Sequence, residues 1–182
     1  MKKFIPLVLA FLTSFLFPIV SRAQETPNFD GPQNIFHDDL LDHMVGDWHL
    51  SGSVMGETAD HHVHVEWVLN HQFLRIHEKA AVPSKAGLVY EAMVMVGYDN
   101  ASERYVAHWI DVFGGRFSET LGYGHRDASK IEFLFEYPDG PFRTTFRWDA
   151  ETKAWHWQMR QKDKSGAWTD FSNFILTAER KQ

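Results

Sequence analysis

Apolar and polar residues alternate in short runs through the second half of the chain, and turn-forming residues separate the runs. Ile131, Phe133 and Phe135 occupy every second position of one run, which ends at the turn sequence 138–141. The run 142–148 then repeats the pattern. A period of two with aromatic and β-branched residues is typical of half-buried strands. Because the intervening turns are short, consecutive strands are predicted to pair as antiparallel neighbours.

The same pattern extends over most of the chain and predicts about ten strands. An open sheet with that many strands would leave two unpaired edges and an exposed apolar face, whereas a closed sheet has neither. Upstream, Phe36, Leu40 and Met44 recur at a spacing that places one apolar stripe on a short helix near residues 35–45. We therefore predict an all-β fold, a single antiparallel up-and-down β-barrel with one short N-terminal helix covering an end. The predicted strands are 48–54, 63–69, 73–81, 88–98, 104–112, 117–124, 131–137, 142–148, 155–159 and 168–178.

The first residues have the composition of a secretory signal peptide. Lys2 and Lys3 precede an apolar run, and the small residues Ser21 and Ala23 occupy the −3 and −1 positions of a cleavage site. An uncleaved membrane anchor is the alternative interpretation, but the run is slightly short for a span. Cleavage after Ala23 predicts a secreted or periplasmic protein without a stable membrane span. The predicted segments are a signal peptide (1–23), a flexible leader (24–34) and the β-barrel domain (35–182).

The composition narrows the classes of partner. The chain has 18 Lys and Arg against 24 Asp and Glu, a formal net charge of −6, and loss of the basic signal peptide makes the mature chain more acidic. An acidic surface repels phosphate backbones, so we predict no nucleic-acid binding. The absence of cysteine excludes disulfides and a lipidated cysteine anchor. Stability therefore depends on packing, and 15% of the residues are aromatic. The sequence leaves the oligomeric state open.

Four segments resemble a known bacterial family, the domain-of-unknown-function family 1579, and the resemblance covers about residues 36–180. The resemblance implies a calycin-like, lipocalin-related β-barrel, and it implies no activity. Kinship of fold with lipocalins, fatty-acid-binding proteins and nitrobindins suggests an internal cavity by analogy. The segments are Leu41-x-x-Met44-x-Gly46-x-Trp48, Trp67-x-Leu69-x-x-x-Phe73-Leu74, Val96-Gly97-Tyr98-Asp99-Asn100-Ala101 and Tyr105-Val106-Ala107-His108-Trp109-Ile110-Asp111.

A haem cofactor is one consequence of that kinship to consider. In nitrobindin-like barrels a late histidine ligates haem iron, and His156 is the nearest candidate by position. The alternation gives Trp155 and Trp157 one strand face and His156 the outward one. We therefore predict no cofactor.

The main functional hypothesis is that a small apolar or amphipathic molecule binds in the barrel cavity. A barrel of this size can be too wide to fill, and inward aromatic side chains would then line the remaining space. Arg75 and His77 would face inward with Phe73, and Glu119 or Asp111 would pair with the arginine. In the alternative arrangement Arg75 faces outward and Glu119 lies near a rim. The candidate ligand-binding residues are Trp67, Arg75, His77, Trp109, Asp111, Glu119, Tyr123, Phe133, Phe146 and Trp157.

Two other functions remain open. The same cavity could belong to an isomerase or hydrolase that uses His77 with Asp111 or Glu119 as a general acid–base pair. The sequence contains no established catalytic motif, so no catalytic residue is assigned. The barrel could also be filled, and the protein could serve as an interaction partner in the cell envelope without binding a ligand.

A histidine cluster at 61, 62 and 64 is the most conspicuous local pattern. His62 and His64 share a strand face and could hold a metal together with Asp60 or Glu66. The alternative is a solvated face opposite Val63 and its inward neighbours. Because a structural zinc site needs about four fixed ligands and usually cysteine, we predict that all three histidines lie on the surface and form no metal site.

Overall fold

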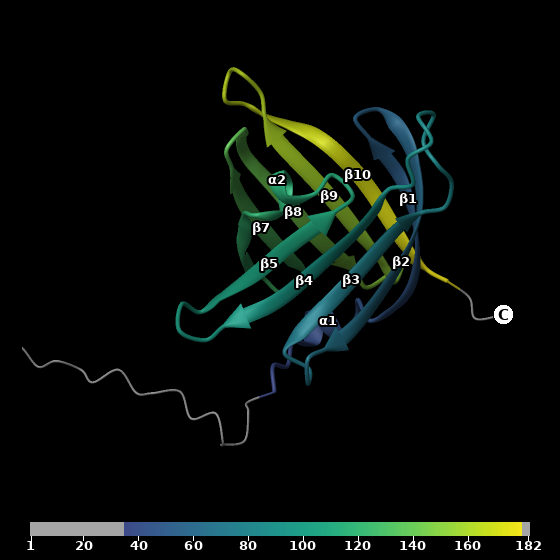
Figure 1. Cartoon of the computed structure of the whole chain (residues 1–182). Coiled ribbons are helices and arrows are strands. Elements are labelled where there is room, and N and C mark those ends of the chain that lie inside the picture. The colour runs from purple at the N-terminus through teal and green to yellow at the C-terminus, as the bar shows by residue number, and fades with distance from the viewer. Residues whose placement is uncertain (1–34, 180–182) are drawn as a thin grey trace, which may run out of the picture. The chain divides into compact units, whose positions relative to one another are not determined.

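A computed structural model describes residues 35–179 and shows a closed antiparallel barrel of ten strands (Figure 1). Each strand pairs with its neighbours in the chain, and β1 pairs with β10 to close the sheet. The predicted all-β, up-and-down barrel is confirmed. The predicted signal peptide and leader (1–34) lie outside the described residues. The strands are β1 Gly46–Val54, β2 Glu57–Val68, β3 Phe73–Ala80, β4 Glu91–Asp99, β5 Arg104–Asp111, β6 Leu121–Arg126, β7 Lys130–Tyr137, β8 Gly140–Asp149, β9 Ala154–Lys162 and β10 Trp168–Ala178.

The N-terminal helix is shorter than predicted. Helix α1 spans Asp39–Asp42, begins after the capping side chain of Asp38, and buries Leu40 and Leu41. After Asp42 the backbone forms tighter turns, in which the N–H groups of Met44 and Val45 bond carbonyls three residues earlier, and β1 begins at Gly46. The carbonyl of Met44 accepts a 2.7 Å hydrogen bond from the indole of Trp48. In Figure 1, α1 lies at one end of the barrel. Neither helix within residues 35–179 is long or apolar enough to span a membrane.

A second short helix occupies the start of the strand predicted at 117–124. Helix α2 spans Gly115–Ser118, and β6 begins only at Leu121. The inward face of β6 belongs to Gly122 and Gly124, whereas Tyr123 faces outward with 40% of its surface exposed. The prediction that Tyr123 faces the interior is therefore wrong.

The two glycines face inward because bulky rings of β7 occupy the adjacent space. A Cβ atom on Gly122 would lie 2.5 Å from Cζ of Phe135, and one on Gly124 would lie 2.7 Å from Cδ1 of Phe133. Both rings are fully buried. The β7 rings thus fill the space where β6 side chains would lie, and only glycine on β6 leaves room for them.

Gly122→Ala should lower the free energy of unfolding by about 1–3 kcal/mol, because the added methyl group forces the buried Phe135 ring to move. Urea denaturation followed by tryptophan fluorescence would measure the change. Gly115→Ala, whose Cβ would meet nothing within 4 Å, is the matched control and should not destabilise the protein. The double change Gly122→Ala with Phe135→Leu should cost less than the sum of the two single changes. Equal effects of the two alanine substitutions would contradict this packing argument.

Candidate functional site

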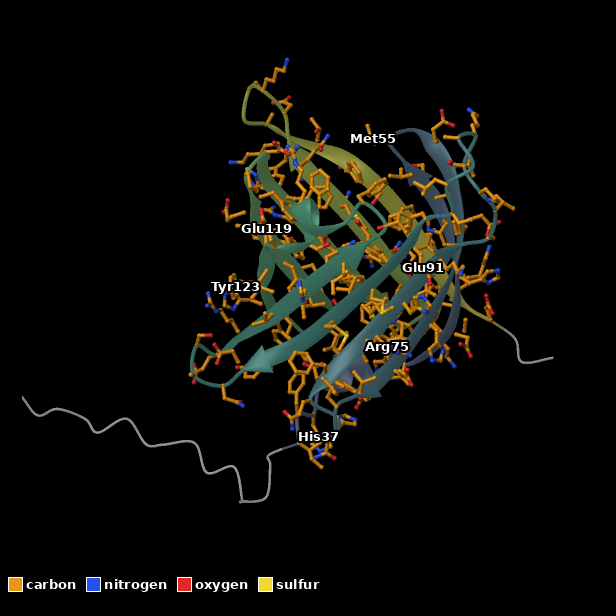
Figure 2. The ribbon with its side chains drawn as sticks, viewed as in Figure 1. His37, Met55, Arg75, Glu91, Glu119 and Tyr123 are labelled. Carbon is orange, nitrogen blue, oxygen red and sulfur yellow. The ribbon has the colours of Figure 1, made fainter. Side chains whose placement is uncertain are left out.

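The barrel contains a cavity of 1090 Å³ that opens at the end opposite α1. Its walls come from the strand ends near that opening and from the loops between them. Met55, labelled in Figure 2, lies in the loop between β1 and β2 at this open end. The half of the barrel nearer α1 is packed with aromatic rings. The deep apolar lining includes Trp109, Phe135, Phe142, Met159 and Phe174.

A histidine–carboxylate pair lies on the cavity wall. Nδ1 of His61 is 2.5 Å from Oε1 of Glu78, and the glutamate side chain is only 2% exposed. The second oxygen of Glu78, Oε2, has no hydrogen-bond partner in the described residues. The hydroxyls of Thr144 and Ser172, also buried and also lining the cavity, have no partner there either. Buried polar atoms are normally paired, so this wall has unused capacity to bind a polar group.

A second carboxylate lies in the same row of the sheet as Glu78. Glu78 pairs with Ala92 of β4, and Ala92 pairs with Asp111 of β5. Glu78 and Asp111 line the cavity, and the small buried side chain of Ala92 lies between them in the row. Two strand spacings separate Glu78 and Asp111, about 10 Å between Cα atoms.

The pKa values of two tyrosines near the cavity are raised, in part by these charges. Burial raises the pKa of Tyr90 well above its usual range, and the negative charges of Glu78 and Asp111 raise it further. Burial also raises the pKa of Tyr137 to about 12, with a further contribution from Asp111. The cavity is therefore an environment that disfavours additional negative charge.

Alkaline titration should reveal these tyrosines. The folded pKa of Tyr137, about 12, exceeds the value of about 10 expected in the unfolded chain, so the folded state holds more protons between these limits. The corresponding stability is complete below about pH 10 and is lost as the pH rises toward 12. Absorbance at 295 nm at pH 11 should show fewer tyrosinates in the native protein than in urea. The same count in both conditions would contradict the burial of these hydroxyls.

The end near α1 is closed by a buried polar network. Asp38 caps α1 by accepting a 2.9 Å hydrogen bond from the backbone N–H of Leu41, and it also accepts hydrogen bonds from Tyr105 and Arg126. The Arg126 Nη1 atom lies 2.6 Å from Oδ1 of Asp38. Phe36 stacks on Tyr98 beside this network. These contacts hold α1 in the barrel end and leave a hollow of 500 Å³ on the outside.

Five of the predicted ligand-binding residues do face the interior, at different depths. Trp109 and Asp111 line the cavity. Phe133, Phe146 and Trp157 instead belong to the packed core below it. The ring of Trp157 lies 5.6 Å from that of Trp109 and 4.7 Å from that of Phe146, and tilted rings packed at these distances leave no ligand space among them.

Trp67 is also at the wrong end for the cavity. Its indole donates a 2.8 Å hydrogen bond to Asp42, and its ring packs against Phe36 and His71. Trp67 therefore helps to hold α1.

The inward placement of Arg75 and His77 is wrong. Leu74, Ile76 and Glu78 form the buried face of β3, so the residues between them lie on the outer wall. Arg75 bonds Glu66, and Nε2 of His77 is 2.7 Å from Oε1 of Glu91. Figure 2 labels Arg75 and Glu91 on adjacent strands of this wall.

Glu119 does not reach the interior either. It follows α2 directly and its side chain is exposed, on the same side of the barrel as the outward Tyr123 (Figure 2). The acid–base pair proposed from His77 with Asp111 or Glu119 is therefore wrong, because His77 and Glu119 are outside and Asp111 is inside.

The histidine cluster divides between the two faces of β2. His62 and His64 lie on the outer wall as predicted, 2.6 Å from Glu179 and Asp47 respectively. The surface position predicted for His61 is wrong: His61 faces the cavity, on the same face of β2 as the inward Val63. The period of two that places Val63 inside also places His61 inside, so this signal was present in the sequence. His156 lies on the outer wall, 3.9 Å from Asp149.

The described residues thus define a small up-and-down β-barrel protein with one end closed by a helix and one end open. A family model described as "Protein of unknown function (DUF1579)" matches residues 36–176, and the chain belongs to that family. No curated protein matches the sequence significantly. Among solved structures, a redesigned β-barrel is similar, at 10% identity and a TM-score of 0.42, over 78% of this chain and 96% of that chain. The barrel assignment rests on the strand pairing described above.

Proposed function

We propose that this protein binds a small amphipathic molecule in the open half of its barrel. The observation that supports the proposal is the 1090 Å³ cavity, whose wall combines aromatic side chains with unpaired buried polar atoms. Ligand cavities in proteins usually have volumes of about 300–1,000 Å³ and a few polar groups on an apolar wall. The apolar part of the ligand would lie against Trp109, Phe135 and Phe174, and its polar part would reach the acidic row at Glu78.

Apolar burial is sufficient to hold such a molecule. Each methylene group removed from water contributes about 0.8 kcal/mol, so a chain of several methylene groups offsets the loss of translational freedom on binding. The indole of Trp109 lines the cavity and provides an intrinsic fluorescent reporter. The hollow beside α1 is about half as large, at 500 Å³.

Titration with N-phenyl-1-naphthylamine, a probe that fluoresces in apolar surroundings, would test cavity binding. We expect saturable fluorescence enhancement with one site per chain. Ala80→Trp places a large ring in the cavity from the inner face of β3 and should abolish the enhancement. Ala150→Trp, on an exposed turn near the closed end, is the matched control and should bind normally. Absence of saturable binding, or equal binding by both variants, would overturn the proposal.

We further propose that the protein acts outside the cytoplasm, after cleavage between Ala23 and Gln24. The support is the basic start, the apolar run and the small residues at 21 and 23. Cell fractionation followed by mass spectrometry of the purified chain should find a mature N-terminus at Gln24. Ala23→Asp should leave the precursor uncleaved. A full-length chain in the cytoplasmic fraction of wild-type cells would contradict this location.

A further inference from the structure

We infer that the ligand of this cavity carries a protonated amine, which binds between the carboxylates of Glu78 and Asp111. The inference rests on the proposed binding function and specifies the chemical class of the ligand. An acidic head-group would be repelled by these carboxylates, and an uncharged one would bind them more weakly. Three observations support the inference: the charges around the cavity, the position of both acids in one row of the sheet, and the aromatic rings beside them.

Negative charge predominates inside the barrel. Glu78 shares one oxygen with His61 and leaves Oε2 unpaired, although the side chain is almost fully buried. Asp111 accepts a 2.9 Å hydrogen bond from the backbone N–H of Phe113. Within residues 35–179, no lysine or arginine forms an ion pair with either carboxylate. A buried carboxylate oxygen is a strong acceptor, and a charged N–H donor is its strongest complement.

The spacing of the two acids suits a single cationic group. Glu78, Ala92 and Asp111 are neighbours in one row across β3, β4 and β5. The two Cα atoms are about 10 Å apart, and both side chains project into the cavity from the concave wall of a closed barrel. Ala92 has a small buried side chain and does not line the cavity, so a cation would approach the two acids from the cavity that both of them line. An ammonium group has three N–H donors and can serve both carboxylates at once.

Aromatic rings complete the site. The Tyr90 ring lies 5.7 Å from that of His61 and 6.0 Å from that of Phe113. Burial raises the pKa of Tyr90, and the negative charges of Glu78 and Asp111 raise it further, so this ring lies in the electric field of both acids. Faces of aromatic rings attract cations, and the attraction grows when the site is shielded from water.

Other occupants fit this wall less well. A carboxylate or phosphate bound at this row would be added to two existing negative charges, and neither of the lysines that line the cavity, Lys85 and Lys162, forms an ion pair with Glu78 or Asp111. A metal ion would need more ligands, and in the described part of the chain no three His, Asp or Glu side chains come close enough to hold one. Lys85, at the cavity mouth, is 3.3 Å from Glu57. An organic cation with an apolar body uses both the acidic row and the aromatic wall below it.

Three probes with the same ten-carbon chain would test the inference: decylamine, decanol and decanoate, each below its micelle concentration at pH 7. Binding to the mature chain would be measured by isothermal titration calorimetry and by the change in total tryptophan fluorescence, to which Trp109 on the cavity wall contributes. We expect decylamine to bind at least about tenfold more tightly than decanol, the factor that one charge-assisted hydrogen bond provides, and decanoate to bind most weakly. Equal or tighter binding of decanol or decanoate would overturn the amine assignment while leaving the proposed function intact. Failure of all three probes and of N-phenyl-1-naphthylamine would overturn the proposed function itself.

Charge-removing variants would locate the amine. Glu78→Gln and Asp111→Asn should each weaken decylamine binding by about tenfold and leave decanol binding nearly unchanged. Glu132→Gln is the matched control, because Glu132 bonds Thr145 and Arg143 on the outer wall. If Glu78→Gln does not fold, Asp111→Asn at the half-buried rim still decides the question. Unchanged decylamine affinity in Asp111→Asn would overturn the proposed position of the ammonium group.

Discussion

Asp38→Ala should lower the free energy of unfolding by about 3–5 kcal/mol, the usual cost of removing one partner from a buried ion pair. The Asp38 side chain is 2% exposed, and its two oxygens accept hydrogen bonds from three different elements of the protein. Removing it leaves the Arg126 guanidinium and the Tyr105 hydroxyl without their buried acceptor. It also removes the cap of α1, which contributes about 1 kcal/mol in typical helices.

Two neighbouring changes separate these effects. Asp39→Ala removes an exposed carboxylate that also contacts Arg126, at 2.9 Å, and should have little effect because water replaces it. Asp38→Asn keeps an oxygen for the helix cap but removes the charge, so its effect should be intermediate. Urea denaturation of the three variants would measure the series. A similar loss of stability in Asp38→Ala and Asp39→Ala would show that the network does not hold the closed end.

The strand pattern was sufficient to predict the barrel, because each strand pairs with the next one in the chain. In the described sheet, β1 and β10 are the one pair of neighbours that are not consecutive in the chain, and their pairing follows from the cost of open edges. The lengths of the helices were not predictable in this way. Helix α1 ends at Asp42, and the tighter turns that follow it, like the bond from Trp48 to the Met44 carbonyl, are not specified by the spacing of apolar residues.

Strand faces were harder to predict where both faces carry mixed residues. In β3, Phe73 suggested that its face was the inner one, but its ring lies over Gly97 of the neighbouring strand, within 2.6 Å of where a Cβ would be. The apolar pair Leu74 and Ile76 marks the true inner face. Following that face to Glu78 would have found the buried carboxylate of the candidate site.

The sequence therefore predicted the part of the cavity wall on β5 but not the part on β3. Trp109 and Asp111 come from β5, whose alternation is regular, and both were placed correctly on the inner face. Their partner Glu78 was missed because a charged residue is rarely fully buried, and an inward glutamate runs against the average behaviour of its type. The register that places Glu78, Ala92 and Asp111 in one row comes from strand pairing, which the sequence does not specify residue by residue.

Trp157 lies in the packed core just below the cavity, and Trp157→Ala should lower the free energy of unfolding by about 3–5 kcal/mol. Trp157 is completely buried, and its ring packs against Phe146 at 4.7 Å and Phe174 at 6.0 Å. Trp157→Phe should cost clearly less, because it keeps an aromatic ring and removes an indole N–H that has no partner among the described residues. Trp168→Ala is the control, since that ring lies at the rim beside Arg143 and contributes about 0.5–1 kcal/mol as a cation–π pair.

Probe binding by Trp157→Phe should match the wild type, because Trp157 lies beneath the cavity. Weakened binding in this folded variant would show that the ligand reaches deeper than Trp109.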